Sequence, residues 1–185
     1  MVLLKNRKIA ILITVIVVFL SMLFGVGRSL NRLAANTERM FYEGVYLEDR
    51  GFVQPAINAH LENITNLALD CATVFANHPD LAHFSEAVRF ARRDLLEANS
   101  ISDKFGAYLG IREVFIAFFN AADAVELYDG DRSLIDGFAH TFFGAVNAIE
   151  SSAYNDMAVG FMGGVSGFAQ LLRPIVSVTP PQTFG

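Results

Sequence analysis

The feature that most constrains this chain is an uncharged apolar run near its N-terminus, residues 9–26. Thirteen of these residues are Ile, Leu, Val or Phe, and each favours the bilayer centre by about 0.3–0.6 kcal/mol. Extended to Gly27, the run makes a helix of about 28 Å, close to the ~30 Å thickness of the hydrocarbon layer. A cleaved signal peptide would have a shorter apolar region and a better cleavage site than Gly25–Gly27. We therefore predict a retained transmembrane anchor at residues 9–27.

Basic residues flank the predicted anchor on both sides. Three precede it within residues 1–8 and three follow it over a wider interval: Lys5, Arg7 and Lys8 before, and Arg28, Arg32 and Arg39 after. Cytoplasmic flanks carry an excess of Lys and Arg, and the tighter cluster here is N-terminal. The pattern predicts a single-pass protein of the cell membrane whose remaining chain lies on the extracytoplasmic side.

The charge of the chain changes sign after the anchor. The whole chain carries a net −5, but from Ser29 onward it holds ten basic and nineteen acidic residues, a net of −9. Phosphate binding needs a concentrated basic face. The one local basic cluster (Arg89, Arg92 and Arg93) alternates with acidic residues, as on a solvated helix face. We expect the lipid bilayer as the partner of residues 9–27 and no nucleic-acid partner.

Beyond the anchor, apolar residues recur at three- and four-residue steps, and no strand alternation persists. This predicts an all-α fold: an antiparallel helical bundle of four to five long helices, preceded by the transmembrane helix. The predicted helices cover residues 28–47 in continuation of the anchor, then 55–77, 81–98, 102–128, and 134–173 as one helix or two in line. The predicted division is a basic segment at 1–8, the anchor at 9–27, the bundle at 28–173 and an extended tail at 174–185.

Two sets of apolar residues are predicted to build most of the core. The helix after the anchor offers Leu30, Leu33, Met40, Phe41 and Val45, and the later helices offer Phe115, Phe118, Phe119, Phe138, Phe142 and Phe143. A turn at Asp129–Asp131 joins the two Phe-rich helices, and so short a connection predicts antiparallel neighbours. The helix at 55–77 adds a stripe that runs from Ile57 through Ile64 to Cys71.

Residues able to carry chemistry are sparse. The single cysteine, Cys71, lies among apolar residues, which favours a small buried hydrophobe over a reactive thiol. Asp80 and His83 share a helical spacing, but a zinc site needs further Cys or His ligands, so capping of a helix start by Asp80 is the better interpretation. The sequence contains no nucleophile elbow, phosphate-binding loop or dinucleotide fingerprint. We predict no enzyme activity, no metal and no cofactor.

The most unusual local pattern is a stripe of four glycines that fall on one helical face: Gly160, Gly163, Gly164 and Gly167. Each costs about 1 kcal/mol relative to Ala inside a helix, so a closely packed neighbour would have to offset the loss. Packing against the Phe-rich helices is the favoured interpretation. A surface for self-association or for a partner protein, and shallow contact with the membrane, remain open alternatives.

Three places in the sequence together resemble the LemA family of membrane-anchored bacterial helical proteins. They are the layout of basic N-terminus, single span and aromatic-led helix with Phe41–Val45, the segment Leu61–Leu67, and Tyr154-Asn155 with the closing Pro180–Phe184. The sequence departs from the family pattern at Thr65, at Met162–Gly163 and at Ala169, as a divergent member would. The resemblance implies a membrane-tethered antiparallel helical bundle and no particular biochemical activity.

The expected function is therefore that of a membrane-tethered scaffold or interaction protein of LemA type, whose partner is an unknown protein or a second copy of the chain. The alternative is an extracytoplasmic bundle that senses a small ligand and signals through a partner. A sensor needs a cavity of more than about 300 Å³ with a few convergent polar groups. A scaffold needs only a full core and an accessible surface.

Overall fold

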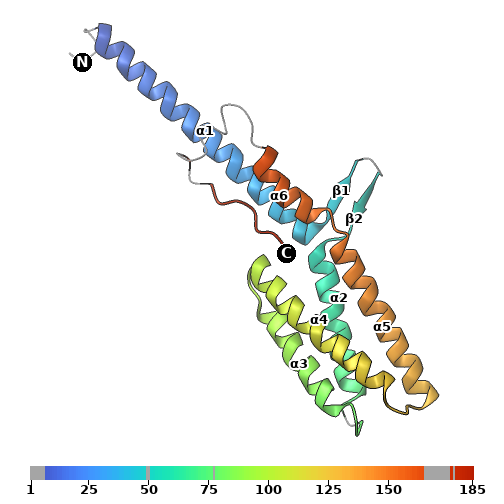
Figure 1. Cartoon of the computed structure of the whole chain (residues 1–185). Helices are drawn as coiled ribbons and strands as arrows, with labels where there is room; N and C mark the ends of the chain where they lie inside the picture. Colours follow the sequence, from blue (N-terminus) through green and yellow to red (C-terminus); the bar gives the residue numbers. More distant parts are fainter. Residues whose placement is uncertain (1–6, 49–50, 77, 165–175, 177) are drawn as a thin grey trace. The chain divides into compact units, whose positions relative to one another are not determined.

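The computed structural model describes residues 7–48, 51–76, 78–164, 176 and 178–185 and confirms the all-α class. Its elements are α1 (Arg7–Glu43), β1 (Val45–Leu47), β2 (Phe52–Gln54), α2 (Ile57–Val74), α3 (Ala82–Glu97), α4 (Ile101–Asp123), α5 (Asp129–Glu150) and α6 (Tyr154–Gly164) (Figure 1). The chain forms two compact units. The anchor unit comprises Met1–Glu38 and Met157–Pro181, and the bundle unit comprises Arg39–Asp156 and Gln182–Gly185.

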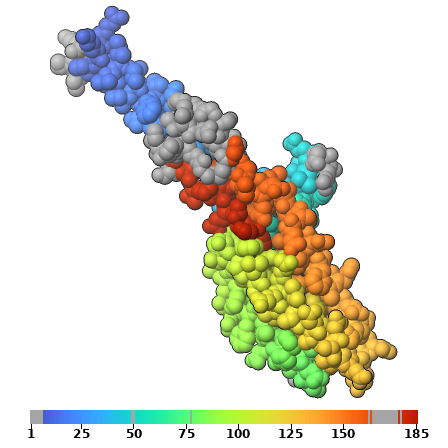
Figure 2. Space-filling view, in the orientation of Figure 1, coloured from blue at the N-terminus to red at the C-terminus, as the bar shows by residue number. Residues whose placement is uncertain are grey.

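Helix α1 is continuous from Arg7 to Glu43, as predicted for an anchor that extends beyond the membrane. Its N-terminal part, blue in Figure 2, is long and apolar enough to cross a bilayer, and all of its large apolar side chains from Ile11 to Phe24 except Leu23 are exposed. The hydroxyls of Thr14 and Ser21 donate to the carbonyls of Ala10 and Val17, four residues earlier. These two polar side chains are therefore satisfied within the helix itself, as a lipid environment requires.

In the rest of the anchor unit, one side of α1 and one side of α6 are buried. The buried residues are Leu30, Ala34 and Thr37 on α1, and Ala158 and Phe161 on α6. Leu33, which was predicted to belong to this stripe, is 49% exposed, so that prediction is wrong. A straight helix has 3.6 residues per turn, so its buried side continues from Leu30 to Ala34 and Thr37 and leaves Leu33 outside it. Gly27 is also buried, and a Cβ there would lie 2.6 Å from Cγ1 of Val176.

The bundle unit is built around α2. Helix α3 packs on both α2 and α4, while α5 packs chiefly on α2. The predicted α2 stripe is confirmed, since Ile57, Leu61, Ile64, Leu67, Ala68 and Cys71 are all buried. The carbonyls of α2 also accept hydrogen bonds from two arginines of α3, from Arg89 to Ala72 (3.2 Å) and from Arg92 to Thr65 (3.0 Å). These two arginines thus join α3 to α2, where the sequence predicted only a solvated face.

The Phe-rich core is confirmed at four of its six predicted positions. Phe115, Phe118, Phe119 and Phe142 are buried, whereas Phe138 is half-buried and Phe143 is 50% exposed. Rings from α4 and α5 meet directly: the centroids of Phe115 and Phe142 lie 4.6 Å apart. Aromatic pairs of this kind add about 0.5–1.5 kcal/mol beyond the area that they bury. The two Phe-rich helices therefore share a core, although α5 makes its main contact with α2.

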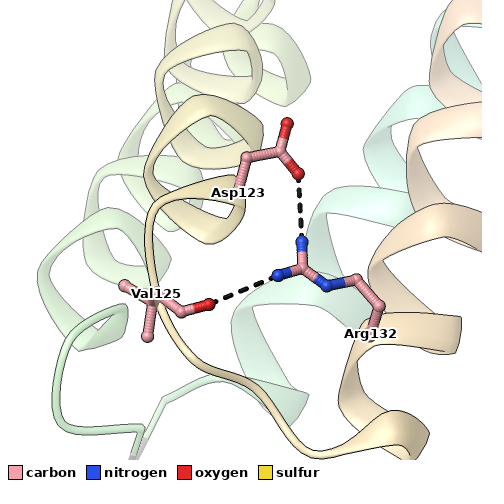
Figure 3. A network of polar contacts seen from close by, with 3 residues as sticks. All are labelled: Asp123, Val125 and Arg132. Atoms are coloured by element: carbon pink, nitrogen blue, oxygen red, sulfur yellow. Dashed lines mark hydrogen bonds and ion pairs between the residues drawn. The ribbon is translucent and has the colours of Figure 1, made fainter.

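The turn between α4 and α5 lies closer to the N-terminus than the sequence predicted. Asp129–Asp131 was predicted as the turn, but Asp129 begins α5 and the connection is Ala124–Tyr128. Arg132 closes this connection (Figure 3): its guanidinium lies 3.0 Å from Oδ1 of Asp123 and donates to the carbonyl of Val125 at 3.3 Å. The acidic residues suit the start of a helix because its N-terminal end carries a partial positive charge.

Two further expectations are corrected. The stretch after α1 contains an antiparallel hairpin in which Val45 pairs with Gln54 and Leu47 with Phe52, where the sequence predicted no strand. Gly44 has φ +93°, and a Cβ there would lie 2.4 Å from the carbonyl oxygen of Gln54, so only glycine fits between α1 and β1. Asp80 does not cap α3, whose N-cap residue is Leu81 and has no side-chain capping bond.

Candidate functional site

The closing residues of the chain dock onto the bundle unit through the side chain of Asn155, at the start of α6. The Asn155 amide nitrogen donates to the carbonyl of Phe184 (2.5 Å), and the Phe184 amide donates to Oδ1 of Asn155 (2.8 Å). The hydroxyl of Tyr154 donates to the carbonyl of Gln182. Two adjacent side chains therefore satisfy three backbone groups of the tail. We call this arrangement, with the rings described next, the tail clasp.

The ring of Phe184 inserts among aromatic residues from α1 and α4. It is 3% exposed, and its centroid lies 5.1 Å from that of Phe105 and 5.5 Å from those of Phe41 and Tyr108. Phe41 in turn lies 5.5 Å from Tyr154. Full burial of a Phe side chain contributes about 1.5–3 kcal/mol, so the tail is held by apolar contact as well as by hydrogen bonds.

Gln182 extends the clasp to the N-terminus of α4. Its Oε1 accepts from the amide of Ser102 at 3.2 Å, while the hydroxyl of Ser100, the N-cap residue, accepts from Asp103. The first amides of a helix have no partner within it, and here the tail supplies one. The sequence predicted an extended tail at residues 174–185, and it did not predict the docking of Gln182–Gly185. The segments that carried the LemA resemblance, at Phe41–Val45, Tyr154-Asn155 and Pro180–Phe184, supply Phe41, Tyr154, Asn155 and Phe184 to the clasp.

A second polar bridge fixes the break between α5 and α6. The side chain of Gln54, the last residue of β2, donates to the carbonyl of Ser151 (3.1 Å) and accepts from the amide of Ala153 (2.9 Å). The predicted segment 134–173 is therefore two helices over its described part, with Ser151–Ala153 between them. The hairpin supplies partners for backbone groups that the interruption leaves without helical partners.

Open clefts lie on the described surface of the bundle unit, and three of them are lined by residues of its helices. The first, of about 580 Å³, lies along α3 and is lined by His83, Glu86, Arg89 and Phe90 among others. The second, of about 320 Å³, lies near Asn58 and Lys104. The third, of about 620 Å³, runs between α2 and α5. None of the residues that line these clefts belongs to the buried quartet Phe115, Phe118, Phe119 and Phe142.

The α2–α5 groove, as we call the third cleft, combines an apolar floor with a polar rim. Leu67, Leu134 and Phe138 line it together with the polar side chains of Asn63, Asn66, Asp70, Ser133 and Thr141. Small residues recur on α5 at four-residue steps, at Ser133, Gly137 and Thr141, and a Cβ at Gly137 would meet no atom within 4 Å. A helix face of small residues allows another helix to approach closely. The groove therefore has the composition of a docking surface.

Burial shifts the pKa values of a few titratable groups in the described part of the chain. Burial raises the pKa of the Cys71 thiol to about 12, which keeps it protonated and agrees with the predicted buried hydrophobe. Burial also raises the pKa of Tyr108, whose buried hydroxyl has no hydrogen-bond partner among the described residues. Among the residues that the structure describes, no three His, Cys, Asp or Glu side chains gather as metal ligands.

The predicted glycine stripe lies only partly within the described residues. Gly160 and Gly163 are on α6, both are exposed, and an added Cβ at either would meet no atom within 4 Å. Gly164 ends α6, and Gly167 lies outside the described residues. No described residue packs against Gly160 or Gly163, and the role of the stripe stays a prediction.

Comparisons with family models, with curated proteins and with solved structures give no match for this chain. The LemA resemblance stays a prediction, and what the chain does has to be inferred from its own geometry.

Proposed function

We propose that the protein is a membrane-tethered, non-catalytic docking module whose bundle binds a helical segment of a partner protein in the α2–α5 groove. Its place would be the cell membrane, with the bundle on the extracytoplasmic side as the flanking charges predict. A divergent LemA-type protein would have this layout. The exposed apolar helix at the N-terminus supports the tether, and the groove supports the docking role.

The observation that carries the proposal is the shape of the groove. Helix-in-groove recognition places apolar side chains of the incoming helix on an apolar floor and satisfies its polar edge at the rim. Leu134 is 45% exposed at this floor, and Gly137 leaves room beside it. Asn63 and Asn66, on the α2 side, offer both donors and acceptors at the rim.

The charge of the groove indicates the chemistry of the partner. Among the described residues that line it, only Asp70 has a charged side chain, and the chain from Ser29 onward carries a net −9. Opposite charge speeds encounter and fixes the register of an interface. The expected partner is therefore an amphipathic helix with small apolar residues on one face and a basic residue near Asp70.

Site-specific photo-crosslinking in native membranes tests the proposal. A crosslinking amino acid at Asn66, in the groove, should capture a discrete partner band, while the same amino acid at Glu113, exposed on α4 away from the groove, should not. Gly137→Leu fills the groove and should abolish most of the Asn66 product. Overpacking costs about 1–3 kcal/mol, which corresponds to roughly a 5- to 150-fold loss of affinity.

A matched control separates loss of the groove from loss of the fold. Gly106→Leu places the same side chain on an exposed α4 glycine with equally open surroundings, and it should leave the Asn66 product unchanged. Equal loss in both variants, or a product that survives Gly137→Leu, would contradict docking in this groove. Crosslinking of Asn66 to a second copy of the chain would replace the partner protein by self-association.

A further inference from the structure

The tail docks onto the bundle unit through a short segment. Each hydrogen bond and ring contact described above between the tail and the bundle unit is made by Gln182 or Phe184. Their partners all belong to the bundle unit, as Gln182–Gly185 itself does, whereas Met157–Pro181 belongs to the anchor unit. The docked segment is therefore a small element that directly follows a unit boundary in the sequence.

The clasp holds this segment in the way that peptide-binding domains hold an extended peptide. The side chain of Asn155 both donates to and accepts from the backbone of Phe184, as a neighbouring strand would. Two side chains of the segment are bound separately: the ring of Phe184 fills an aromatic pocket, and Oε1 of Gln182 accepts from the amide of Ser102. In such complexes backbone hydrogen bonds provide affinity, and sites for alternate side chains provide specificity. The clasp is therefore a recognition site for the pattern Gln-x-Phe.

The chain that leads into the clasp is exposed and extended. Thr179 and Pro180 are exposed, and so is Gln182 at the start of the docked segment. Consecutive prolines favour an extended chain of about 3.1 Å per residue, and Pro180 and Pro181 directly precede the segment. An exposed, extended approach suits a segment from a neighbouring molecule as well as one from the same chain.

A second copy of the chain carries the same segment, so it can supply every contact that the tail makes in the clasp. Exchange of an identical element between two copies requires no new interface and is a low-cost route to a dimer. Its main cost is the loss of translational and rotational freedom of one copy. Anchoring in one membrane reduces this cost, because copies of the same orientation hold their bundle units on the same side of the bilayer.

We infer that the tail clasp is also a self-association site, in which the bundle unit of one copy binds Gln182–Phe184 of a second copy. The inference rests on the tether in the proposed function, and it is independent of the α2–α5 groove. The tail of the same chain competes for the site at an effective concentration on the order of millimolar. Binding between copies should therefore increase with their density in the membrane.

Crosslinking between two differently tagged forms of the full chain tests the inference. The clasp form carries Ser102→Cys and the tail form carries Gln182→Cys, at two exposed positions whose residues are hydrogen-bonded in the clasp. Both forms are reconstituted in the same lipid vesicles and treated with a short bifunctional maleimide. The native Cys71 does not react, because burial raises the pKa of its thiol to about 12. A control form with Tyr128→Cys, at an 86% exposed position, replaces the tail form and reports random collisions.

The inference expects a product that carries both tags with the tail form and almost none with the control form. Raising the density of copies tenfold should raise this product about tenfold while it is a minor fraction, because the effective concentration of the attached tail does not change. Phe184→Ala should act in opposite directions in the two forms. In the tail form it removes the ring that fills the pocket and should lower the product about tenfold or more. In the clasp form it removes the competing ring and should raise the product, and circular dichroism checks that helix content is kept.

A chain with both cysteines shows whether the clasp forms. An intrachain product from this chain, without a product that carries both tags at either density, would mean that the tail binds only its own bundle and would overturn the inference. Absence of both products would remove the clasp and the inference with it. A product that survives Phe184→Ala in the tail form, or that is lost with Gly137→Leu in both forms, would place the contact elsewhere and also overturn the inference. Flotation with the vesicles tests the tether separately, and a chain that does not float would contradict the tether and the inference together.

Discussion

The anchor stretch of α1 and helix α2 are both rich in aliphatic residues, yet these side chains are mostly exposed in the first and largely buried in the second. Along α1, all of the large apolar side chains from Ile11 to Phe24 except Leu23 are exposed. In α2, a stripe from Ile57 to Cys71 is buried, while Glu62, Asn66 and Asp70 face outward. The comparison teaches that the arrangement of apolar residues, more than their number, distinguishes a helix made for lipid from one made for a protein core.

The largest effect that tests this comparison comes from the same substitution at two positions of α1. Phe41 is fully buried in the bundle unit, whereas Phe19 is 44% exposed in the anchor stretch. Phe41→Ala should lower the free energy of unfolding by about 3–5 kcal/mol, as expected for a buried Phe. Phe19→Ala should leave the unfolding of the bundle unchanged in detergent. Chemical denaturation followed by circular dichroism measures both, and equal losses would break the comparison.

A charge placed in the anchor stretch should have the next largest effect. Val18→Lys puts a cation at the centre of the predicted span, which costs about 2.5–3.5 kcal/mol of insertion free energy. Val53→Lys, on an exposed residue of β2, is the matched control and should cost little. Alkaline carbonate extraction of membranes reports the inserted fraction. Full retention of Val18→Lys in the membrane pellet would show that this stretch does not lie at the bilayer centre.

A smaller effect is expected where the tail meets the bundle unit. Asn155→Ala removes two hydrogen bonds to Phe184, one in each direction, and should lower the free energy of unfolding by about 1–3 kcal/mol. Asn147→Ala, at an exposed position of α5, should change it by much less. Amide hydrogen exchange at Phe184 gives an independent readout. Protection there that survives Asn155→Ala would mean that the rings alone hold the tail.

The smallest effect concerns a glycine with open surroundings, compared with one that is closely packed. Gly110 lies on α4 with open space where a Cβ would be, so Gly110→Ala should stabilise the bundle by about 0.5–1 kcal/mol. Gly44→Ala, where φ is positive and the Gln54 carbonyl blocks the Cβ, should destabilise it instead. Thermal unfolding of the two variants should shift in opposite directions. Destabilisation by Gly110→Ala would indicate a packed neighbour at that surface.

The helices could be predicted because their signals are local. Apolar residues at three- and four-residue steps located α2 and α3 to within three residues and α4 to within five, and every predicted stripe residue of α2 is buried. The continuation of α1 past the membrane followed in the same way from its periodicity. The prediction failed at Leu33, because residues chosen at fixed sequence steps gradually move around a straight helix and leave its buried side.

The tail clasp could not be predicted, because it depends on contacts between distant positions. Asn155 and Phe184 are separated by 29 residues, and neither has a local pattern that points to the other. The hairpin was not predicted for a different reason: three-residue strands are too short to show an alternation of apolar and polar residues. The glycines Gly44 and Gly51, both with positive φ, were the available signal for it.

The tail clasp makes the end of the chain an intramolecular ligand, and its occupancy then follows from effective concentration. Gln182–Gly185 contributes one buried ring and a few hydrogen bonds, which would bind only weakly as a free peptide. Covalent attachment supplies the same segment at a local concentration on the order of millimolar. A competing peptide would have to reach a similar concentration to displace the attached segment. A single proteolytic cut at the exposed Thr179 would abolish the advantage while leaving every contact of the clasp chemically intact.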